Sequence, residues 1–178
     1  MSQKSYDGSA ILYLIPTPIG NLDDMTYRAV KILKEVEVVF SEDTRVTNML
    51  FHHFDIHKKL YASHEHNEER NIKKCLSYLE QGLSVGVVSD RGTPVISDPG
   101  YVLAKAAIES GYHVVGLPGA TALIPALIMS GLDPKPFTFY GFLNSKSGKR
   151  KNELENLKNI RHTIIFYEAP HRIEKTLE

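Results

Sequence analysis

The sequence has a single cysteine, Cys75, among its 178 residues. No disulfide can form within the chain, which is typical of proteins from a reducing cytoplasm. No apolar run approaches the roughly 20 residues of a membrane-spanning helix, and the N-terminal segment has too short an apolar run and the wrong flanks for a signal peptide. We expect a cytoplasmic protein that does not engage a membrane.

The chain also has no net charge, because 21 basic residues are matched by 21 acidic ones. This balance argues against a protein that coats nucleic acid non-specifically, although a local basic patch is compatible with it. The apolar fraction of 42% is enough for a packed core and argues against global disorder.

Several common signatures are absent. Without G-x-G-x-x-G or G-x-x-x-x-G-K-[ST], dinucleotide and nucleoside triphosphate sites lose their usual support. Without G-x-S-x-G or a Cys–His pairing, nucleophilic hydrolysis has no signature. The spacing of the histidines fits no zinc site, so we expect no metal and surface positions for His52, His53, His57, His64 and His66.

The sequence does contain a Gly/Pro-rich loop after an apolar run, LSVGVVSDRGTPVISDPG, at residues 83–100. The run at 85–88 predicts a strand buried on both faces. Gly92 and Pro94 end that strand, and a helical pattern follows at 101–110. The carboxylate of Asp90 would therefore lie at the carboxyl end of a buried strand, where open α/β sheets bind ligands.

Strands and helices alternate along most of the chain. Strands are expected at 10–15, 36–40, 60–63, 84–89 and 113–116, with helices between them. This order predicts an α/β fold with a mainly parallel five-stranded sheet and helices on both faces. We expect an N-terminal α/β lobe at 1–118 and the start of a second α/β lobe at 119–178. That second lobe looks truncated, because the chain ends inside a predicted helix.

Three Gly/Pro loops follow strands of the predicted sheet, at 17–21, 90–94 and 118–121. Because the carboxyl ends of parallel strands meet at one edge, we expect these loops to form one crevice. An ordinary strand-to-helix turn stays open for 90–94, since Asp, Gly and Pro are common turn residues. The residues alone predict a small-molecule-binding α/β domain with a basic second lobe.

Two charged segments are candidates for phosphate contacts. In EDTR, residues 42–45, Asp43 can cap a helix, or Arg45 can clamp a phosphate. The run 146–151 holds four cations in six residues. Such a run is usually a solvated helix start, but it also suits a phosphate backbone. Arg172, at the start of the final helix, could add to it.

Together these segments resemble the bacterial 16S ribosomal RNA (cytidine-2'-O)-methyltransferases of the tetrapyrrole methylase superfamily. The resemblance spans nearly the whole chain in family order, through LYLIPTPIGNLDDMTYRAVKILKEVEVVFSEDTR, HEHNEE, VSDRGTPVISDPGY, LPGATALIPALIMSGL, FYGFLNSKSGKR and TIIFYEAPHR. The sequence departs from the family at Arg91, where a small residue is usual. Family members also continue well beyond this length.

The resemblance implies a two-lobed tetrapyrrole methylase-like fold, a homodimer, and S-adenosylmethionine as methyl donor. The implied reaction is 2'-O-methylation of a cytidine in 16S ribosomal RNA of the small ribosomal subunit. By position in the family segments, cofactor contacts are expected from Pro18, Asp90, Thr93, Pro94, Thr121, Ala122, Phe142, Leu143 and Tyr167.

A ribose hydroxyl is hard to deprotonate, so a general base near the methyl group would help. The candidates are Glu42, Asp43 and Glu168. RNA phosphates are expected on Arg45, Lys149, Arg150 and Arg172.

Two alternatives stay open. One is methylation of a tetrapyrrole-like small molecule, the activity of sister families, and the other is a non-catalytic S-adenosylmethionine-binding fragment. The basic run at 146–151 and the EDTR segment favour RNA over a macrocycle. The sequence leaves open which residue is the base, what Arg91 does, whether the shortened chain is active and whether a partner protein assists.

Overall fold

In the computed structural model the chain forms two compact units, Met1–Thr121 and Ala122–Glu178. The structure describes residues 8–64, 67–98 and 100–178. Within these ranges no helix is both long and apolar enough to cross a membrane.

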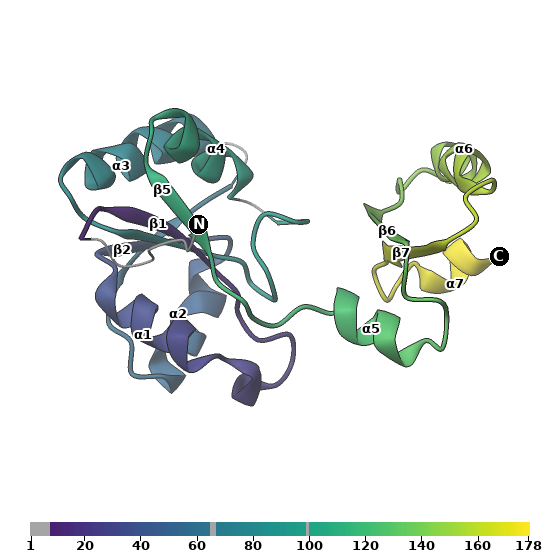
Figure 1. Ribbon diagram of the computed structural model, residues 1–178, viewed down its shortest axis with the longest axis horizontal. Helices are drawn as coiled ribbons and strands as arrows, with labels where there is room; N and C mark the ends of the chain where they lie inside the picture. The colour runs from purple at the N-terminus through teal and green to yellow at the C-terminus, as the bar shows by residue number, and fades with distance from the viewer. Residues whose placement is uncertain (1–7, 65–66, 99) are drawn as a thin grey trace. The chain divides into compact units, whose positions relative to one another are not determined.

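The first unit is built on a five-stranded, wholly parallel sheet (Figure 1). Its strands are β1 (Ile11–Ile15), β2 (Val38–Ser41), β3 (Lys59–Ala62), β4 (Val85–Val88) and β5 (His113–Gly116). They lie in the order β3-β2-β4-β1-β5, so β4 is inserted between β1 and β2. The predicted fold class, α/β with a parallel five-stranded sheet, is confirmed.

Two helices cover each face of this sheet (Figure 1). One face carries α1 (Tyr27–Glu35) and α2 (Thr44–His53), and the other carries α3 (Glu68–Glu80) and α4 (Tyr101–Glu109). The chain runs outward from β1 to β3 and then back to β4 and β5. Because crossovers between parallel strands are right-handed, this reversal moves the later helices to the opposite face.

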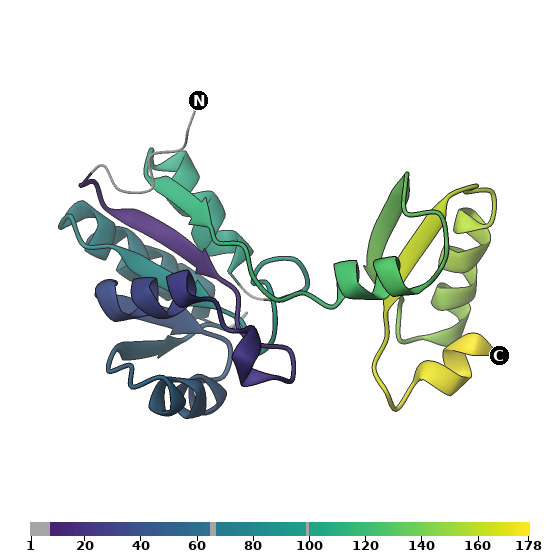
Figure 2. The ribbon, with the colours of Figure 1, turned by 60° about the horizontal axis from the view of Figure 1, so that its bottom comes forward.

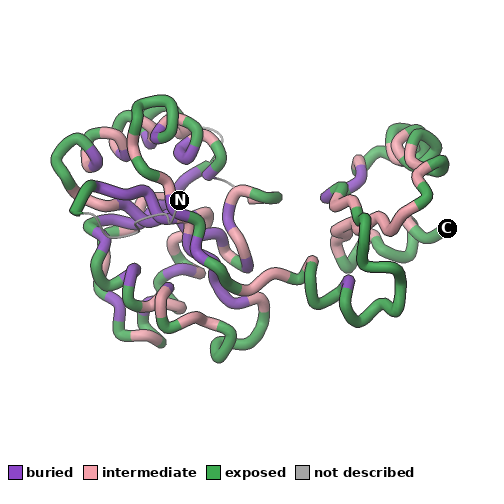
Figure 3. The backbone as a smooth tube through the Cα atoms, in the orientation of Figure 1, coloured by how far each residue is buried: buried purple, intermediate pink, exposed green. Residues whose placement is uncertain are grey.

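The core of the first unit lies on both sides of the sheet, as the buried strands in Figure 3 show. Alternate residues of β1 divide between the faces: Tyr13 packs with α1 and α2, whereas Leu12 packs with α3 and α4. All four residues of β4 are buried, as the apolar run predicted. A Cβ at Gly86 would come within 3.2 Å of Val39 Cγ2, which explains the glycine inside this strand.

The second unit contains a parallel pair of strands, β6 (Phe137–Phe142) and β7 (Thr163–Tyr167) (Figure 2). Its helices are α5 (Leu123–Met129), α6 (Ser147–Leu157) and α7 (Ile173–Leu177). All five residues of β7 are only partly buried. The aromatic rings of Phe139 and Phe142 pack edge-on against Tyr167.

Candidate functional site

The loop after β4 occupies the point where the sheet changes direction. The helix that follows β4 lies on one face, whereas the helices that follow its neighbours β1 and β2 lie on the other. Beyond the carboxyl ends of these three strands, the chain therefore leads to helices on opposite faces of the sheet. Such a switch point leaves a crevice, and it is where ligands bind in open α/β sheets.

A buried network joins the loop after β4 to the loop after β1. The amide of Thr17 donates to Gly92 O over 2.9 Å, and the amide of Gly92 donates back to Thr17 O over 3.0 Å. Thr17 Oγ1 also donates to Ser89 O, and Ser89 Oγ donates to Gly92 O, each over 3.0 Å. Gly92 has a φ of 82°, a conformation that favours glycine. The two loops are thus held as one wall.

The same loop is tied to the end of β2 by a reciprocal pair of contacts. The amide of Asp43 donates to Asp90 Oδ1 over 2.9 Å, and the Asp90 amide donates to the Glu42 carboxylate. Asp90 therefore does not project freely, because its position is set by the backbone beside it.

On the β5 side, Thr93 Oγ1 donates to Ala120 O over 3.1 Å. A Cβ at Gly119 would lie 2.6 Å from Pro16 Cβ, so the loops after β1 and β5 are also in close contact. The structure thus brings together the three Gly/Pro loops that the sequence singled out. Along the sheet edge the order is Asp43, Asp90, the Thr17–Gly92 bridge and the Thr93–Ala120 contact.

Three carboxyl groups gather around the β2 and β4 ends, and two of them have raised pKa values. The pKa of Glu42 is raised above 4.5, first by burial and then by the negative charges of Asp90 and Asp98. The pKa of Asp98 is raised above 3.8 by burial and by Asp90. Glu42 and Asp98 line a cavity of about 510 Å³ together with His64, Glu68 and Tyr101. Raised carboxyl pKa values in a cavity are typical of functional sites.

Asp98 was not among the residues that the sequence singled out. It lies in a segment with the composition of a turn, and turn composition carries no information about burial. The only available signal was its place in the loop after β4.

Asp43 and Arg45 form a different arrangement. Asp43 caps α2 by accepting from the Arg45 amide over 2.8 Å. Its carboxylate also pairs with the guanidinium of Arg45, with 2.6 Å between Nη2 and Oδ2. These contacts lower the pKa of Asp43 to about 2. A carboxylate with so low a pKa is a weak base, and the side chain of Arg45 stays 87% exposed despite the pair.

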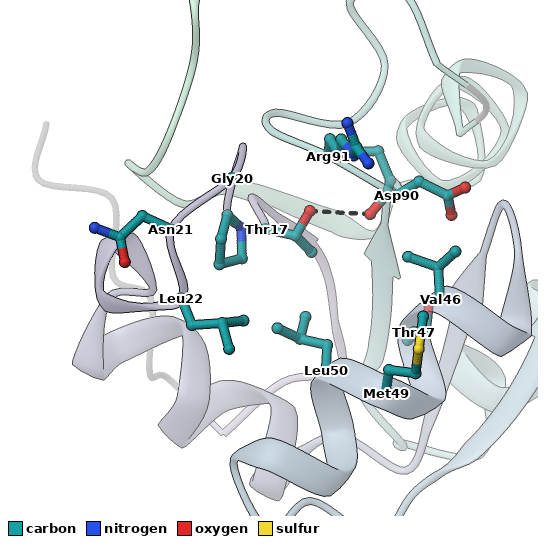
Figure 4. Close-up of a pocket in the computed structure, with 12 residues that line it drawn as sticks. Thr17, Gly20, Asn21, Leu22, Val46, Thr47, Met49, Leu50, Asp90 and Arg91 are labelled. Carbon is teal, nitrogen blue, oxygen red and sulfur yellow. Dashed lines mark hydrogen bonds between the residues drawn. The ribbon is translucent and has the colours of Figure 1, made fainter.

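A second cavity, of about 260 Å³, opens on the α2 side of Asp90 (Figure 4). Leu22 from the short helix η1 (Leu22–Asp24) and Leu50 from α2 point toward one another across it (Figure 4). Its lining residues are Thr17, Pro18, Gly20, Asn21, Leu22, Val46, Thr47, Met49, Leu50, Ser89, Asp90 and Arg91. We call it the α2 pocket. The sequence did not predict it, because its walls come from three separate segments.

In the second unit, Glu168 and Arg172 form an ion pair, with 3.1 Å between Oε2 and Nη2. Glu168 also accepts from Thr176 Oγ1 and the Ala169 amide, and these contacts lower its pKa, that of Thr176 most. Arg172 donates in addition to Leu143 O over 3.1 Å. Both side chains therefore bind groups of their own unit, and the lowered pKa makes Glu168 a weaker base than an ordinary carboxylate.

The other predicted residues of this unit differ in exposure. Lys149 is exposed at the start of α6, whereas Arg150 donates to the carbonyls of Ser145 and Lys175. Leu143 is buried, Phe142 and Ala122 are exposed, and Tyr167 and Thr121 are intermediate.

The histidines bear on the question of a metal. His52, His53, His57 and His64 are exposed, and His57 Nε2 lies 3.0 Å from Asp55 Oδ1. His66 lies outside the described residues. Within residues 8–64, 67–98 and 100–178, no group of three or more potential ligands from His, Cys, Asp and Glu is placed to hold a metal ion.

Comparison with known proteins places this geometry in a family. The family described as Tetrapyrrole (Corrin/Porphyrin) Methylases matches residues 11–178. The chain belongs to the tetrapyrrole methylase family.

Curated relatives are similar over almost the whole chain. The ribosomal RNA small subunit methyltransferase I of Bacillus subtilis is 51% identical over 98% of this chain. The protein of the same name from Vibrio cholerae is 48% identical over 97% of it. The chain spans 61% and 60% of these two relatives.

Solved structures support the fold of this family member. Uroporphyrin III C-methyl transferase from Thermus thermophilus has a TM-score of 0.60 at 19% identity, and the match covers 94% of this chain and 76% of the transferase chain. Diphthine synthase has a TM-score of 0.65 at 15% identity, and the match covers 90% of this chain and 66% of the synthase chain.

Proposed function

We propose that this family member transfers a methyl group from S-adenosylmethionine to the ribose 2'-hydroxyl of a cytidine in 16S ribosomal RNA of the small ribosomal subunit. The observation that carries the proposal is the 51% identity, over 98% of the chain, to a protein named ribosomal RNA small subunit methyltransferase I. The three loops that meet at the carboxyl edge of the sheet are where we expect this chemistry. We also propose that the protein works in the cytoplasm as a homodimer.

The three-loop crevice has the chemistry to hold this methyl donor. S-adenosylmethionine supplies a methyl group on a sulfonium cation, so the protein mainly has to bind and orient it. The carboxylate of Asp90 suits a cationic ligand, and backbone groups near Pro18, Thr93, Pro94 and Thr121 can bind its polar parts. The close approach of Gly119 to Pro16 keeps these loops together. From the second unit we propose contacts by Ala122, Phe142, Leu143 and Tyr167.

Among the three candidate bases, Glu42 is favoured by its electrostatics. Its raised pKa makes it a stronger proton acceptor than an ordinary carboxylate. The lowered pKa values of Asp43 and Glu168 have the opposite effect. We propose that Glu42 accepts the proton that the ribose hydroxyl loses as its oxygen is methylated. The Asp90 amide, which donates to the Glu42 carboxylate, would hold it in place.

RNA phosphates are proposed to contact Arg45, Lys149, Arg150 and Arg172. Arg45 and Lys149 are exposed, whereas Arg150 and Arg172 already donate to carbonyls of their own unit. We therefore expect the largest losses of RNA affinity on removing Arg45 or Lys149.

The function is tested by two measurements on the same preparation. Isothermal titration should show binding of S-adenosylmethionine, and small ribosomal subunits should accept a labelled methyl group at a cytidine ribose. Binding with transfer to a tetrapyrrole instead would identify a small-molecule methylase. Binding without transfer to either substrate would favour a non-catalytic protein, and no binding would refute the proposal for this chain.

A further inference from the structure

The α2 pocket adjoins the proposed cofactor site, with which it shares Pro18 and Asp90. Glu42 lines a different cavity, of about 510 Å³, which has no lining residue in common with the α2 pocket. The Thr93–Ala120 contact lies farther along the sheet edge, beyond the Thr17–Gly92 bridge. The pocket therefore shares Pro18 and Asp90 with the proposed cofactor site, but it contains neither the proposed base nor Thr93 and Pro94.

The surface of the α2 pocket is mainly apolar, and two of its apolar side chains are exposed to solvent. Leu22 is 42% exposed and Met49 is 67% exposed, and both line the pocket with Val46 and Leu50. A large apolar surface at the mouth of a cavity is typical of a binding site. Apolar walls of this kind hold the flat faces of an unstacked nucleobase.

The polar groups around the pocket suit the rest of a nucleotide. Arg91 is exposed, and the structure gives it no ion pair or hydrogen bond among the described residues. Its planar guanidinium is well matched to a phosphate. Asn21 accepts from the Asp23 amide through Oδ1, which leaves its Nδ2 group to donate to a base carbonyl.

The volume of the pocket narrows the choice of ligand. A cavity of about 260 Å³ is below the range of roughly 300 to 1,000 Å³ that drug-sized ligands occupy. A single base with part of its ribose is small enough to enter, whereas a tetrapyrrole macrocycle is too large.

We infer that the α2 pocket binds one unstacked base of the RNA strand, next to the nucleotide whose hydroxyl reaches Glu42. Arg91 then contacts the phosphate between these two nucleotides. This inference rests on the proposed function, because it names how the same site binds its RNA. It also gives a role to Arg91.

Methionine methyl groups provide a direct probe of this pocket. The methyl groups of methionine are labelled with 13C, and each methionine reports on its own surroundings. Met49 lines the pocket, Met25 packs against the core and Met129 lies in the second unit. The ribonucleotide trimer CpCpC, titrated at low salt, should move the Met49 signal upfield by stacking, and leave Met25 and Met129 unchanged. The Met49 signal is assigned by its loss in Met49→Leu.

Two charge variants test the phosphate contact. Arg91→Gln should weaken trimer binding about tenfold, as expected for a hydrogen bond to a charged group, and reduce the salt-dependence slope by about 0.7. Arg70→Gln is the matched control, because Arg70 is an exposed arginine on α3, on the opposite face of the sheet. It should leave both quantities unchanged.

Each other outcome overturns the inference. An unmoved Met49 signal at saturating trimer would exclude a base in this pocket, and equal effects of Arg91→Gln and Arg70→Gln would exclude the phosphate contact of Arg91. A Met49 shift caused by S-adenosylmethionine alone would assign the pocket to the cofactor. A shift that depends only on protein concentration would assign it to a second copy of the chain. Titration with S-adenosylmethionine tests the proposed function separately. The proposed function and the inference about the α2 pocket can therefore fail independently of one another.

Discussion

Asp90 links the two loops on which the proposed chemistry depends. Its carboxylate accepts from the Asp43 amide, and its own amide donates to Glu42. Its charge also contributes to the raised pKa values of Glu42 and Asp98. One residue at the end of β4 therefore contacts the proposed base through its backbone amide and raises the pKa of that base through its charge.

Substitution of Glu42 should change the stability of the fold and the rate of methyl transfer in opposite directions. The ordinary pKa of a glutamate is 4.5, and the pKa of Glu42 is raised above it in the folded protein. Above pH 4.5 the folded state therefore gives up this proton less readily than the unfolded chain does. As a result, the free energy of unfolding falls as the pH rises. Glu42→Gln removes that penalty, so the urea midpoint at pH 7 should increase, with the gain fading below about pH 4. Methyl transfer should fall by roughly 10² to 10⁴ in single-turnover assays.

The control for this substitution is Glu80→Gln, at an exposed position near the end of α3. It should change neither the midpoint nor the rate. Undiminished transfer by Glu42→Gln would refute the assignment of the base.

At the scale of elements, the sequence predicted β4 and its loop well because short-range chemistry decides both. The run at 85–88 is apolar throughout, and Gly92 can adopt the positive φ that its contact with Thr17 requires. Strand order depends instead on which strands pair over long distances, which no local pattern encodes. The insertion of β4 between β1 and β2 was therefore not predicted.

The α2 pocket was missed for a related reason. Met49 lies off the buried side of α2, which Thr47 and Phe51 define, and Leu22 lies in a polar segment. Each is an unremarkable exposed apolar residue in the sequence. Only the fold brings them together, with Arg91 from a third segment at the rim.

The N-terminus of α2 should depend on Asp43 in two separable ways. Asp43→Ala removes both the helix cap and the pair with Arg45, whereas Asp43→Asn keeps a capping side chain. Asp43→Ala should therefore lower the urea midpoint more than Asp43→Asn at pH 7. The stability from the lowered pKa of Asp43 is fully present above its ordinary pKa of 3.8 and lost as pH falls through about 2. Equal midpoints for the two variants at pH 7 would contradict the capping role.

The contact between the loops after β1 and β5 should be sensitive to one methyl group. In Gly119→Ala, the new Cβ would lie 2.6 Å from Pro16 Cβ, so the loops must separate. We expect a loss of about 1 to 3 kcal/mol in the free energy of unfolding and weaker binding of S-adenosylmethionine by titration. Gly116→Ala is the matched control, because a Cβ there meets no atom within 4 Å. Similar losses in both variants would show that loop contact is not the cause.

At the scale of the whole molecule, burial is divided unevenly between the two units. Both clusters of buried hydrophobic side chains found in the described residues lie in the first unit. In the second unit β7 is only partly buried, and Phe142 is exposed. Local opening is easiest where few apolar contacts are lost. The two units should therefore differ in how readily they open.

Hydrogen exchange measured by mass spectrometry can detect this difference. Amides of β1, β2 and β4 should exchange last, since these three strands form the buried centre of the sheet, whereas β6 and β7 should exchange earlier through local opening. S-adenosylmethionine should slow exchange at 89–94, where it is proposed to bind, and leave α3 unchanged as an internal control. Equal protection of β4 and β7 would contradict the unequal stability of the units. Unchanged exchange at 89–94 with saturating ligand would instead contradict the proposed cofactor site.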